Sequence, residues 1–304
     1  MQPIPSRLYN KGKLQEQPTV SCKFIETEVQ YHMEKLRVLF VGNSHTFFND
    51  MPTIFKMFCQ ENGIDAEVVM QAHPGMHLSW HLSQQWELRY GLVQGNFDYL
   101  VFQQAAHPCP PLEETLADGS RVVELARAQG VKPIATITWC ERRFPENQQK
   151  MYDIFDALRE KTGVCCSPVG QVFQRVEQEE KDIDLYWVDG EHASPYGSYV
   201  IAACAFARIT GKSPVGLPYR SICSVPMDRE MFAQVSELRR QAEAEADAAK
   251  KEALTAEANR LSAQAFTPIY DREKLWIELD PDKAARLQKI IAEEIAKYDA
   301  AHQD

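Results

Sequence analysis

The stretch LRVLFVGNSHT, from Leu36 to Thr46, decides the fold. Its first part, LRVLFVG, is a nearly continuous apolar run that ends in glycine, which is typical of a strand covered on both faces of a parallel sheet. Asparagine and serine follow at once, so polar groups leave the strand at its carboxyl end. Open α/β sheets bind their ligands at this edge. The stretch therefore predicts an α/β fold with a candidate site at Ser44.

The residues that follow repeat this alternation of apolar runs and stretches of helical periodicity. Strands that alternate with helices predict a parallel sheet between two helical layers. We expect a three-layer α/β/α fold whose five-stranded parallel sheet has flavodoxin-like order. The further strands are expected at 66–71, 98–103, 132–139 and 164–169, and the helices at 49–63, 77–93, 113–129, 146–161, from about 171, and at 195–210.

The composition changes beyond residue 226. Residues 231–265 are rich in alanine, glutamate, arginine and lysine and contain no glycine or proline, which predicts a long exposed helix or a helical hairpin. We expect an N-terminal arm (1–34), a core (35–226), a charged helical insertion (227–270) and a last helix (271–304) that packs on the core. The insertion is interpreted as a solvated addition, and an arm that makes a homo-oligomer or docks a partner is the alternative.

Composition and charge exclude several classes of protein. The chain has 304 residues, a formal net charge of −10 and a pI of about 5.4, which argues against a nucleic-acid partner. No apolar run reaches the roughly 18–20 residues of a membrane span, and the first residues lack the apolar core of a secretory signal. We therefore expect a cytoplasmic protein with no membrane partner. The eight cysteines form no CxxC pair, so we expect reduced thiols and no structural zinc site.

A second polar block lies near the end of the expected core. Asp189-Gly190-Glu191-His192 follows a short apolar run and leads into an apolar helix. Histidine is the usual general base for a serine hydroxyl, and an aspartate three residues earlier can hold the imidazole in the required tautomer. Either motif alone is more typical of a turn or a helix cap. Their conjunction predicts a catalytic triad of Ser44, His192 and Asp189.

The order of the polar blocks resembles the SGNH (GDSL-like) hydrolase superfamily over roughly residues 36–215. GNS ends at Ser44, Pro74-Gly75 follows the second expected strand, Gln103-Gln104 follows the third, and DGEH occupies 189–192. The chain is most similar to a bacterial branch with GNSxT and DxxHxSxxGSY. The resemblance implies a serine esterase that hydrolyses a small O-acyl ester, such as an acetylated carbohydrate, through an acyl-enzyme. It implies no cofactor.

The chain departs from the family pattern in two places. Asn43 stands where the GDS signature has aspartate, and FQQAAHP (102–108) replaces the usual GxND. In the family the asparagine of that block donates to the oxyanion, so the resemblance gives this role to Gln103 or Gln104, together with the N–H groups of Ser44 and Gly75. The residues expected at the oxyanion or the substrate are Asn43, Gly75, Gln103, Gln104 and His107.

Other sites are weighed against this one. His73, His77 and His81 are four residues apart, but no HExxH motif or matching carboxylate accompanies them, and we expect no metal. Trp139 follows the fourth strand and either contacts substrate or packs at the rim. GxGxxG, P-loop and GxSxG motifs are absent. The rival functions are an SGNH-like protein that binds a ligand without turnover and an interaction protein that acts through the helical arm.

Overall fold

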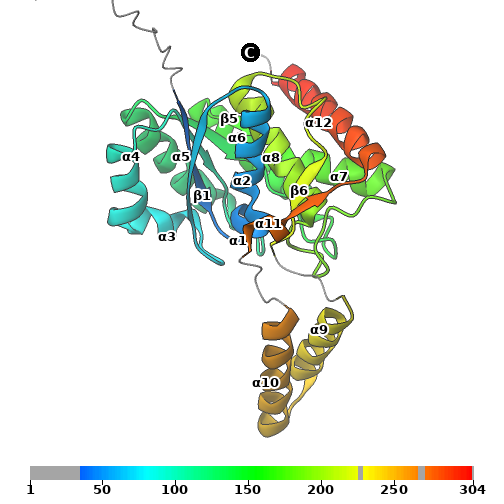
Figure 1. Ribbon diagram of the computed structural model, residues 1–304. Helices are drawn as coiled ribbons and strands as arrows, with labels where there is room; N and C mark the ends of the chain where they lie inside the picture. The colour runs from blue at the N-terminus through cyan, green and yellow to red at the C-terminus, as the bar shows by residue number, and fades with distance from the viewer. Residues whose placement is uncertain (1–34, 225–228, 266–270, 303–304) are drawn as a thin grey trace, which may run out of the picture. The chain divides into compact units, whose positions relative to one another are not determined.

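The computed structural model describes residues 35–224, 229–265 and 271–302, and its centre is a five-stranded parallel sheet (Figure 1). The strand order is β2-β1-β3-β4-β5, which confirms the predicted α/β fold and its flavodoxin-like order. The predicted N-terminal arm, 1–34, lies outside the described residues. The strands are β1 (Leu36–Gly42), β2 (Ala66–Ala72), β3 (Tyr99–Phe102), β4 (Lys132–Thr136) and β5 (Cys165–Ser167).

Both apolar layers of the core meet at β1, which pairs with β2 on one side and β3 on the other. Successive side chains of a strand point to opposite faces, so Val38 and Phe40 join one layer and Leu39 and Val41 the other. All four are buried. Helices cover both faces of the sheet (Figure 1). The first layer contains residues of α2 (Met51–Glu61), α7 (Val169–Glu179), α8 (Pro195–Thr210) and α12 (Pro281–Ala301), and the second contains residues of α3 (Leu78–Ser83), α4 (Tyr90–Gln94), α5 (Leu112–Ala128) and α6 (Asn147–Thr162).

Two predicted helices differ from the observed ones. The expected helix 77–93 is broken at Gln84, whose ψ of 82° is not helical, into α3, a π-helical turn (Gln85–Arg89) and α4. The helix expected from residue 49 begins at Met51, as α2. Asn49 and Asp50 both have positive φ, and Asp50 makes no capping hydrogen bond. Asn49 instead reaches another segment of the chain, as described below.

Residues 231–265 fall within a helical hairpin, the second of the two forms that the sequence allowed. α9 (Arg229–Ala244) and α10 (Ala248–Ala265) pack against each other, with Val235, Ala242 and Ala258 buried. A short antiparallel ribbon, not expected from the sequence, is formed by β6 (Arg220–Ile222) and β7 (Trp276–Glu278). The four-residue helix α11 (Arg272–Leu275) comes directly before β7. The hairpin is therefore inserted between two strands that pair with each other.

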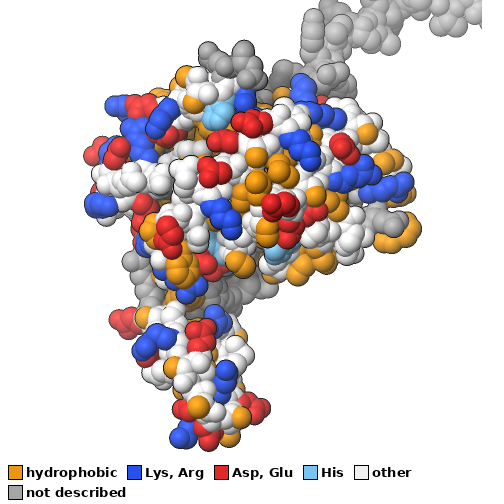
Figure 2. Space-filling view, turned by 180° about the vertical axis from the view of Figure 1, so that it is seen from behind, with side chains coloured by type: hydrophobic (Ala, Val, Ile, Leu, Met, Phe, Trp, Pro, Cys, Tyr) orange, Lys and Arg blue, Asp and Glu red, His pale blue; other side chains and the backbone are white. Residues whose placement is uncertain are grey.

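Charges of both signs are mixed over the α9–α10 hairpin (Figure 2). Arg240 pairs with Glu237 at 2.6 Å, and Arg260 pairs with Glu257 at 2.7 Å, each within one helix. Such exposed pairs contribute little stability and suit a solvated surface. None of the described helices is long and apolar enough to cross a membrane. The seven cysteines in the described residues are free thiols.

The last helix, α12, packs against α7 and α8. Asp280 caps it by accepting from Lys283 N at 3.0 Å, and Leu287, Ile290 and Ile291 are buried. Gln288 Nε2 donates to the Tyr199 hydroxyl and to the Leu217 carbonyl, both at 2.7 Å. The end of the chain therefore contributes apolar and polar contacts to the core.

Ile291→Ala should lower the free energy of unfolding by about 2–5 kcal/mol, because it leaves a cavity under α12. Lys289→Ala, on the exposed side of the same helix, should change it by no more than about 0.5 kcal/mol. Urea denaturation followed by circular dichroism measures both. Equal and small effects of the two variants would show that α12 does not stabilise the core.

Candidate active site

The turn after β1 presents Ser44 at the carboxyl edge of the sheet. A Cβ on Gly42 would lie 2.4 Å from Thr46 Oγ1 and 2.5 Å from Gln103 Oε1, so the close approach of these groups requires glycine. The Asn43 side chain then caps the short helix α1 (Ser44–Phe47). Ser44 is the first residue of that helix and is half-buried. The chain reverses sharply here, and the serine hydroxyl stays at the edge.

The DGEH loop holds an acid and a base on one tight turn. Gly190 has a φ of 71°, a conformation that other residues rarely adopt. Asp189 Oδ1 accepts from the N–H groups of Glu191 at 2.8 Å and His192 at 2.9 Å. Its other oxygen, Oδ2, accepts from His192 Nδ1 at 2.8 Å. The loop thus fixes the carboxylate by its own backbone and directs it at the imidazole.

Ser44, His192 and Asp189 lie in a row of hydrogen bonds, as the order of the motifs predicted. The Ser44 hydroxyl donates to His192 Nε2 at 2.8 Å, which is the distance expected between a nucleophile and its base. Burial favours the neutral form of Asp189, but hydrogen bonds from His192 and from backbone N–H groups outweigh it, so the pKa of Asp189 lies below its usual value. The carboxylate is therefore ionised at neutral pH and keeps the Nδ1–H tautomer of His192.

Asn49 joins the two loops that carry these groups. It is fully buried, and its Nδ2 donates to the Ala193 carbonyl and to Ser198 Oγ, both at 3.0 Å. Ala193 follows the proposed base directly, and Asn49 lies five positions after Ser44. The sequence places Asn49 at the start of an expected helix and gives no sign of this role. Its φ of 52° is the structural sign of a constrained position.

Aromatic rings pack against the imidazole of His192. The Phe48 ring stacks on it at a centroid distance of 4.4 Å, and the His45 ring at 5.1 Å. Burial, and repulsion from His192 and His107, lower the pKa of His45 well below its usual value, although an interaction with the Glu191 main chain opposes this. Burial likewise lowers the pKa of His107 to about 4. Both neighbouring histidines are therefore neutral at pH 7, and neither adds a positive charge beside His192.

Both ends of the Gln103 side-chain amide form hydrogen bonds within the protein. Its Nε2 donates to Asn43 Oδ1 at 3.0 Å and to the Gln104 carbonyl at 2.6 Å. Its Oε1 accepts from Thr46 Oγ1 at 2.9 Å and from Asn43 N at 3.4 Å. Gln103 therefore ties the turn after β1 to the end of β3 and has no N–H left for a substrate. Of the two glutamines, it is the less suitable oxyanion donor.

In Gln104 only the oxygen of the side-chain amide forms hydrogen bonds within the described residues. Its Oε1 accepts from the backbone N–H groups of Leu78 at 3.0 Å and Ala105 at 2.9 Å, and these donors identify which end of the amide is oxygen. Its Nε2 is buried and has no hydrogen-bond partner in the described part of the chain. A buried donor without an acceptor is costly, roughly 1–3 kcal/mol. Gln104 thus holds a donor that no acceptor in the described residues uses.

Gly75 and His107 lie at this edge in different settings. Gly75 is on an exposed turn with a φ of 68°, and the next residue, Met76, accepts from Asn43 Nδ2 at 3.2 Å through its carbonyl. The His107 side chain is buried and lines a cavity of about 200 Å³. The remaining lining residues are Ala106, Pro108, Cys109, Glu141, Phe144, Asn147, Lys150 and Met151.

The three histidines that lie four residues apart, from His73 to His81, have separate partners. His73 Nε2 lies 2.9 Å from Glu87, His77 Nδ1 lies 3.1 Å from Glu114, and His81 Nε2 donates to the Gly42 carbonyl at 2.8 Å. They therefore do not converge on one point. His81 instead supports the end of β1 next to the proposed nucleophile.

Trp139 is a packing residue, which removes the prediction that it contacts substrate. It is 1% exposed, stacks on Phe173 at 4.3 Å, and donates from Nε1 to the Glu191 carbonyl at 2.8 Å. The strand expected over 132–139 ends at Thr136, so Trp139 lies in the loop after β4, where it is buried. Trp139 supports the DGEH loop through its hydrogen bond to the Glu191 carbonyl.

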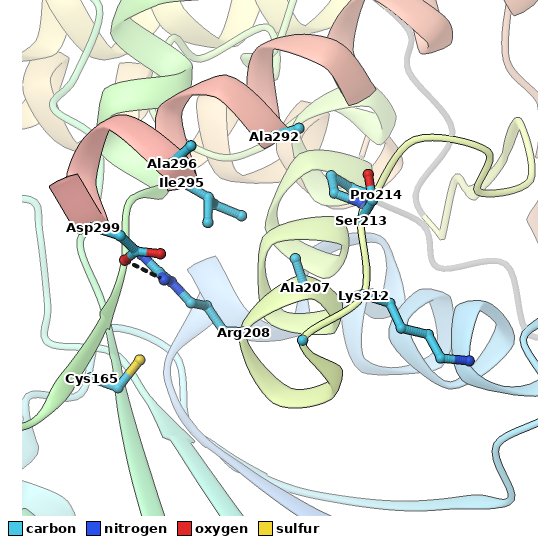
Figure 3. A pocket seen from close by; sticks show the side chains of 11 residues that line it. Cys165, Ala207, Arg208, Lys212, Ser213, Pro214, Ala292, Ile295, Ala296 and Asp299 are labelled. Atoms are coloured by element: carbon cyan, nitrogen blue, oxygen red, sulfur yellow. Dashed lines mark hydrogen bonds and ion pairs between the residues drawn. The ribbon is translucent and has the colours of Figure 1, made fainter.

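Another hollow, of about 470 Å³, lies between α8 and α12 (Figure 3). Cys165, at the amino end of β5, lines it, whereas the triad lies at the carboxyl ends of the strands. Arg208 and Asp299 pair there at 2.7 Å, and burial raises the pKa of the Cys165 thiol. The hollow is separate from the candidate site and holds no paired nucleophile and base.

Comparisons with known proteins bear on the fold. No protein-family model and no curated protein match the chain. A DUF4886 family protein from Bacteroides uniformis ATCC 8492 has a similar structure, with 17% identity over 79% of this chain and 99% of that chain and a TM-score of 0.53. A lipase/acylhydrolase from Enterococcus faecalis (12% identity, 58% of this chain, 96% of that chain) and an acetyl xylan esterase from Geobacillus stearothermophilus (14%, 58% and 94%) both have a TM-score of 0.49. At 17% identity the likeness to the DUF4886 family protein shows the α/β fold alone.

Proposed function

We propose that this protein is a serine ester hydrolase of the SGNH type. The observation that carries the proposal is the hydrogen bond of 2.8 Å from Ser44 Oγ to His192 Nε2, with Asp189 bound to the other ring nitrogen. Residues 148 positions apart make this contact at the sheet edge where α/β proteins bind ligands. A row of nucleophile, base and orienting carboxylate is the arrangement that activates a serine hydroxyl.

The proposed reaction has two steps. Ser44 Oγ attacks the ester carbonyl while His192 Nε2 takes its proton, and the same proton is then given to the leaving alcohol as the acyl-enzyme forms. Water next attacks the acyl group, with His192 again as base, and the acid leaves as Ser44 is restored. Asp189 stays ionised throughout and stabilises the imidazolium that forms in each step.

Gln104 is the proposed side-chain donor to the oxyanion, with the N–H groups of Ser44 and Gly75. Two backbone N–H groups already fix its Oε1, so the amide is held in one orientation before any negative charge develops. The cost of leaving this donor without a partner in the free protein falls away when the oxyanion accepts from it.

The proposed substrate is a small O-acyl ester of a polar alcohol, such as an acetylated carbohydrate. The cavity beside His107 has a volume of only about 200 Å³ and is lined in part by Glu141, Asn147 and Lys150. Pockets for drug-sized ligands are typically about 300–1,000 Å³, so this space favours a short acyl group or one sugar-sized unit. Its polar groups suit hydroxyls better than a long acyl chain.

Ser44→Ala should lower kcat on p-nitrophenyl acetate by about 10⁴–10⁶-fold, because the nucleophile is lost. A fluorophosphonate should label the unchanged protein at Ser44 and leave the variant unlabelled, as mass spectrometry of the peptides can show. Ser79→Ala, at an exposed serine of α3, serves as the matched control and should keep activity and labelling. Near-normal turnover by a folded Ser44→Ala protein would rule out the proposed mechanism.

Gln104→Glu keeps the Oε1 acceptor and removes the Nε2 donor, so it should lower kcat by about 10²–10³-fold with little change in KM. Gln103→Glu, its neighbour, should act mainly on stability, because Gln103 Nε2 bonds only within the protein. Steady-state kinetics and thermal unfolding of both variants separate these effects. A normal kcat in Gln104→Glu would leave oxyanion binding to backbone N–H groups alone.

Replacing residues 231–265 by a short glycine-serine linker should leave ester turnover within about tenfold. The hairpin carries none of the proposed catalytic groups, and its two helices pack mainly on each other. Gel filtration of the deletion and the full chain should accompany the assay. Complete loss of turnover in a folded deletion would mean that the arm shapes the site or maintains an oligomer that the reaction requires.

A further inference from the structure

Three groups that the proposed reaction does not use meet beside the triad: His45, His107 and Glu191. Their ligand atoms lie within 4.8 Å of one another, and within the described residues this is the one such group of three or more found. The two imidazoles stack with their centroids 4.7 Å apart and their planes 4° apart. They come from the turn after β1, the loop after β3 and the DGEH loop, which are distant in the sequence.

Three of the four ring nitrogens of these two histidines are buried and have no hydrogen-bond partner in the described residues. His45 is 5% exposed, and its Nδ1 donates to Asn43 Oδ1 at 3.2 Å. Its Nε2 therefore carries the lone pair, and this atom has no hydrogen-bond partner in the described part of the chain. Both nitrogens of His107 also have none, although Glu141 Oε1 lies 3.6 Å from Nδ1. Buried polar atoms of this kind usually have a partner, so a ligand is indicated.

The surroundings match those of metal-binding histidines. Such a histidine commonly donates its other N–H to a carbonyl or carboxylate, which fixes the ring and its tautomer. Asn43 does this for His45, and Glu141 stands in the corresponding place for His107. Burial lowers the pKa of both histidines, which keeps them in the neutral form that a metal requires.

We propose that His45, His107 and Glu191 form a binding site for a divalent transition-metal ion, with Zn²⁺ as the best fit. Two imidazoles and one carboxylate are a known ligand set for zinc, with a fourth position left for water or another ligand. Mg²⁺ and Ca²⁺ prefer oxygen ligands and fit poorly.

Binding an ion requires the cluster to close and one ring to turn. Donor atoms of a tetrahedral zinc site lie about 3.3 Å apart, so groups within 4.8 Å must approach by roughly 1.5 Å at most. The Glu191 side chain can supply its part of this movement, because the residue is half-buried while its main chain is held by Trp139. One imidazole must also turn out of the stack, because the in-plane lone pairs of two parallel rings do not point at one ion. The cavity of about 200 Å³ that His107 lines gives an ion a way in.

A bound cation would act on the triad. The His45 ring lies 5.1 Å from the His192 ring, and Glu191 is adjacent to His192 in the chain. A positive charge at this distance opposes the imidazolium that the proposed reaction forms. Zinc is therefore expected to inhibit turnover reversibly. The binding itself does not depend on the proposed esterase activity.

Binding is tested on the full chain after chelator treatment, by calorimetric titration with Zn²⁺ and by the visible absorption of Co²⁺. We expect one Zn²⁺ per chain and a tetrahedral Co²⁺ spectrum. His107→Gln and Glu191→Gln should each weaken binding by about 100-fold or more. His77→Gln and Glu114→Gln, an exposed pair of the same composition, are matched controls and should bind normally. Ser44→Ala should also bind normally, whatever its effect on turnover.

Two results would overturn the proposal. One is the absence of stoichiometric binding by the unchanged protein. The other is binding that persists in His107→Gln and Glu191→Gln but disappears in His192→Ala, which would place the ion on the triad instead of the cluster.

Discussion

The candidate site depends on one buried amide. The proposed acid and base are neighbours on a single tight loop, so their mutual geometry is local. Ser44, the proposed nucleophile, is 148 positions away from His192 in the sequence. Its position relative to the DGEH loop must therefore be held by contacts between distant segments. Asn49 provides this link by donating to the Ala193 carbonyl and Ser198 Oγ. Because both bonds are buried, losing them would leave unsatisfied polar groups and release the two loops from each other.

The sheet was predictable because its signals are local and physical. The run LRVLFVG matches β1 in full, since a strand buried on both faces needs apolar residues at successive positions. α8 also matches the prediction at both ends. Ser194 caps it, Pro195 begins it, and Gly211 ends it with a φ of 67°. Pairing of β6 with β7 escaped prediction, because strands of three residues show no alternation and their pairing depends on contacts across the insertion.

The candidate site was predictable only in part, for a related reason. Ser44 follows β1 and His192 lies in the loop before α8, and the order of the blocks was enough to expect their contact. The choice between Gln103 and Gln104 was not available from sequence, since it turns on which amide hydrogens are already bonded. The cluster of His45, His107 and Glu191 follows no spacing motif and becomes visible only when three loops are placed together.

The arrangement of the chain also explains how an insertion of this size can be accommodated. All the proposed catalytic groups precede residue 193, and β6 and β7 pair across the start and end of the insertion. Arg220 lies opposite Glu278 and Ile222 opposite Trp276, so the core continues as if the two strands were joined by a simple turn. The cost of closing a loop grows only slowly with its length. The hairpin can therefore differ in length or sequence while β7 stays paired with β6, and while β6 and α12 keep their places against α8.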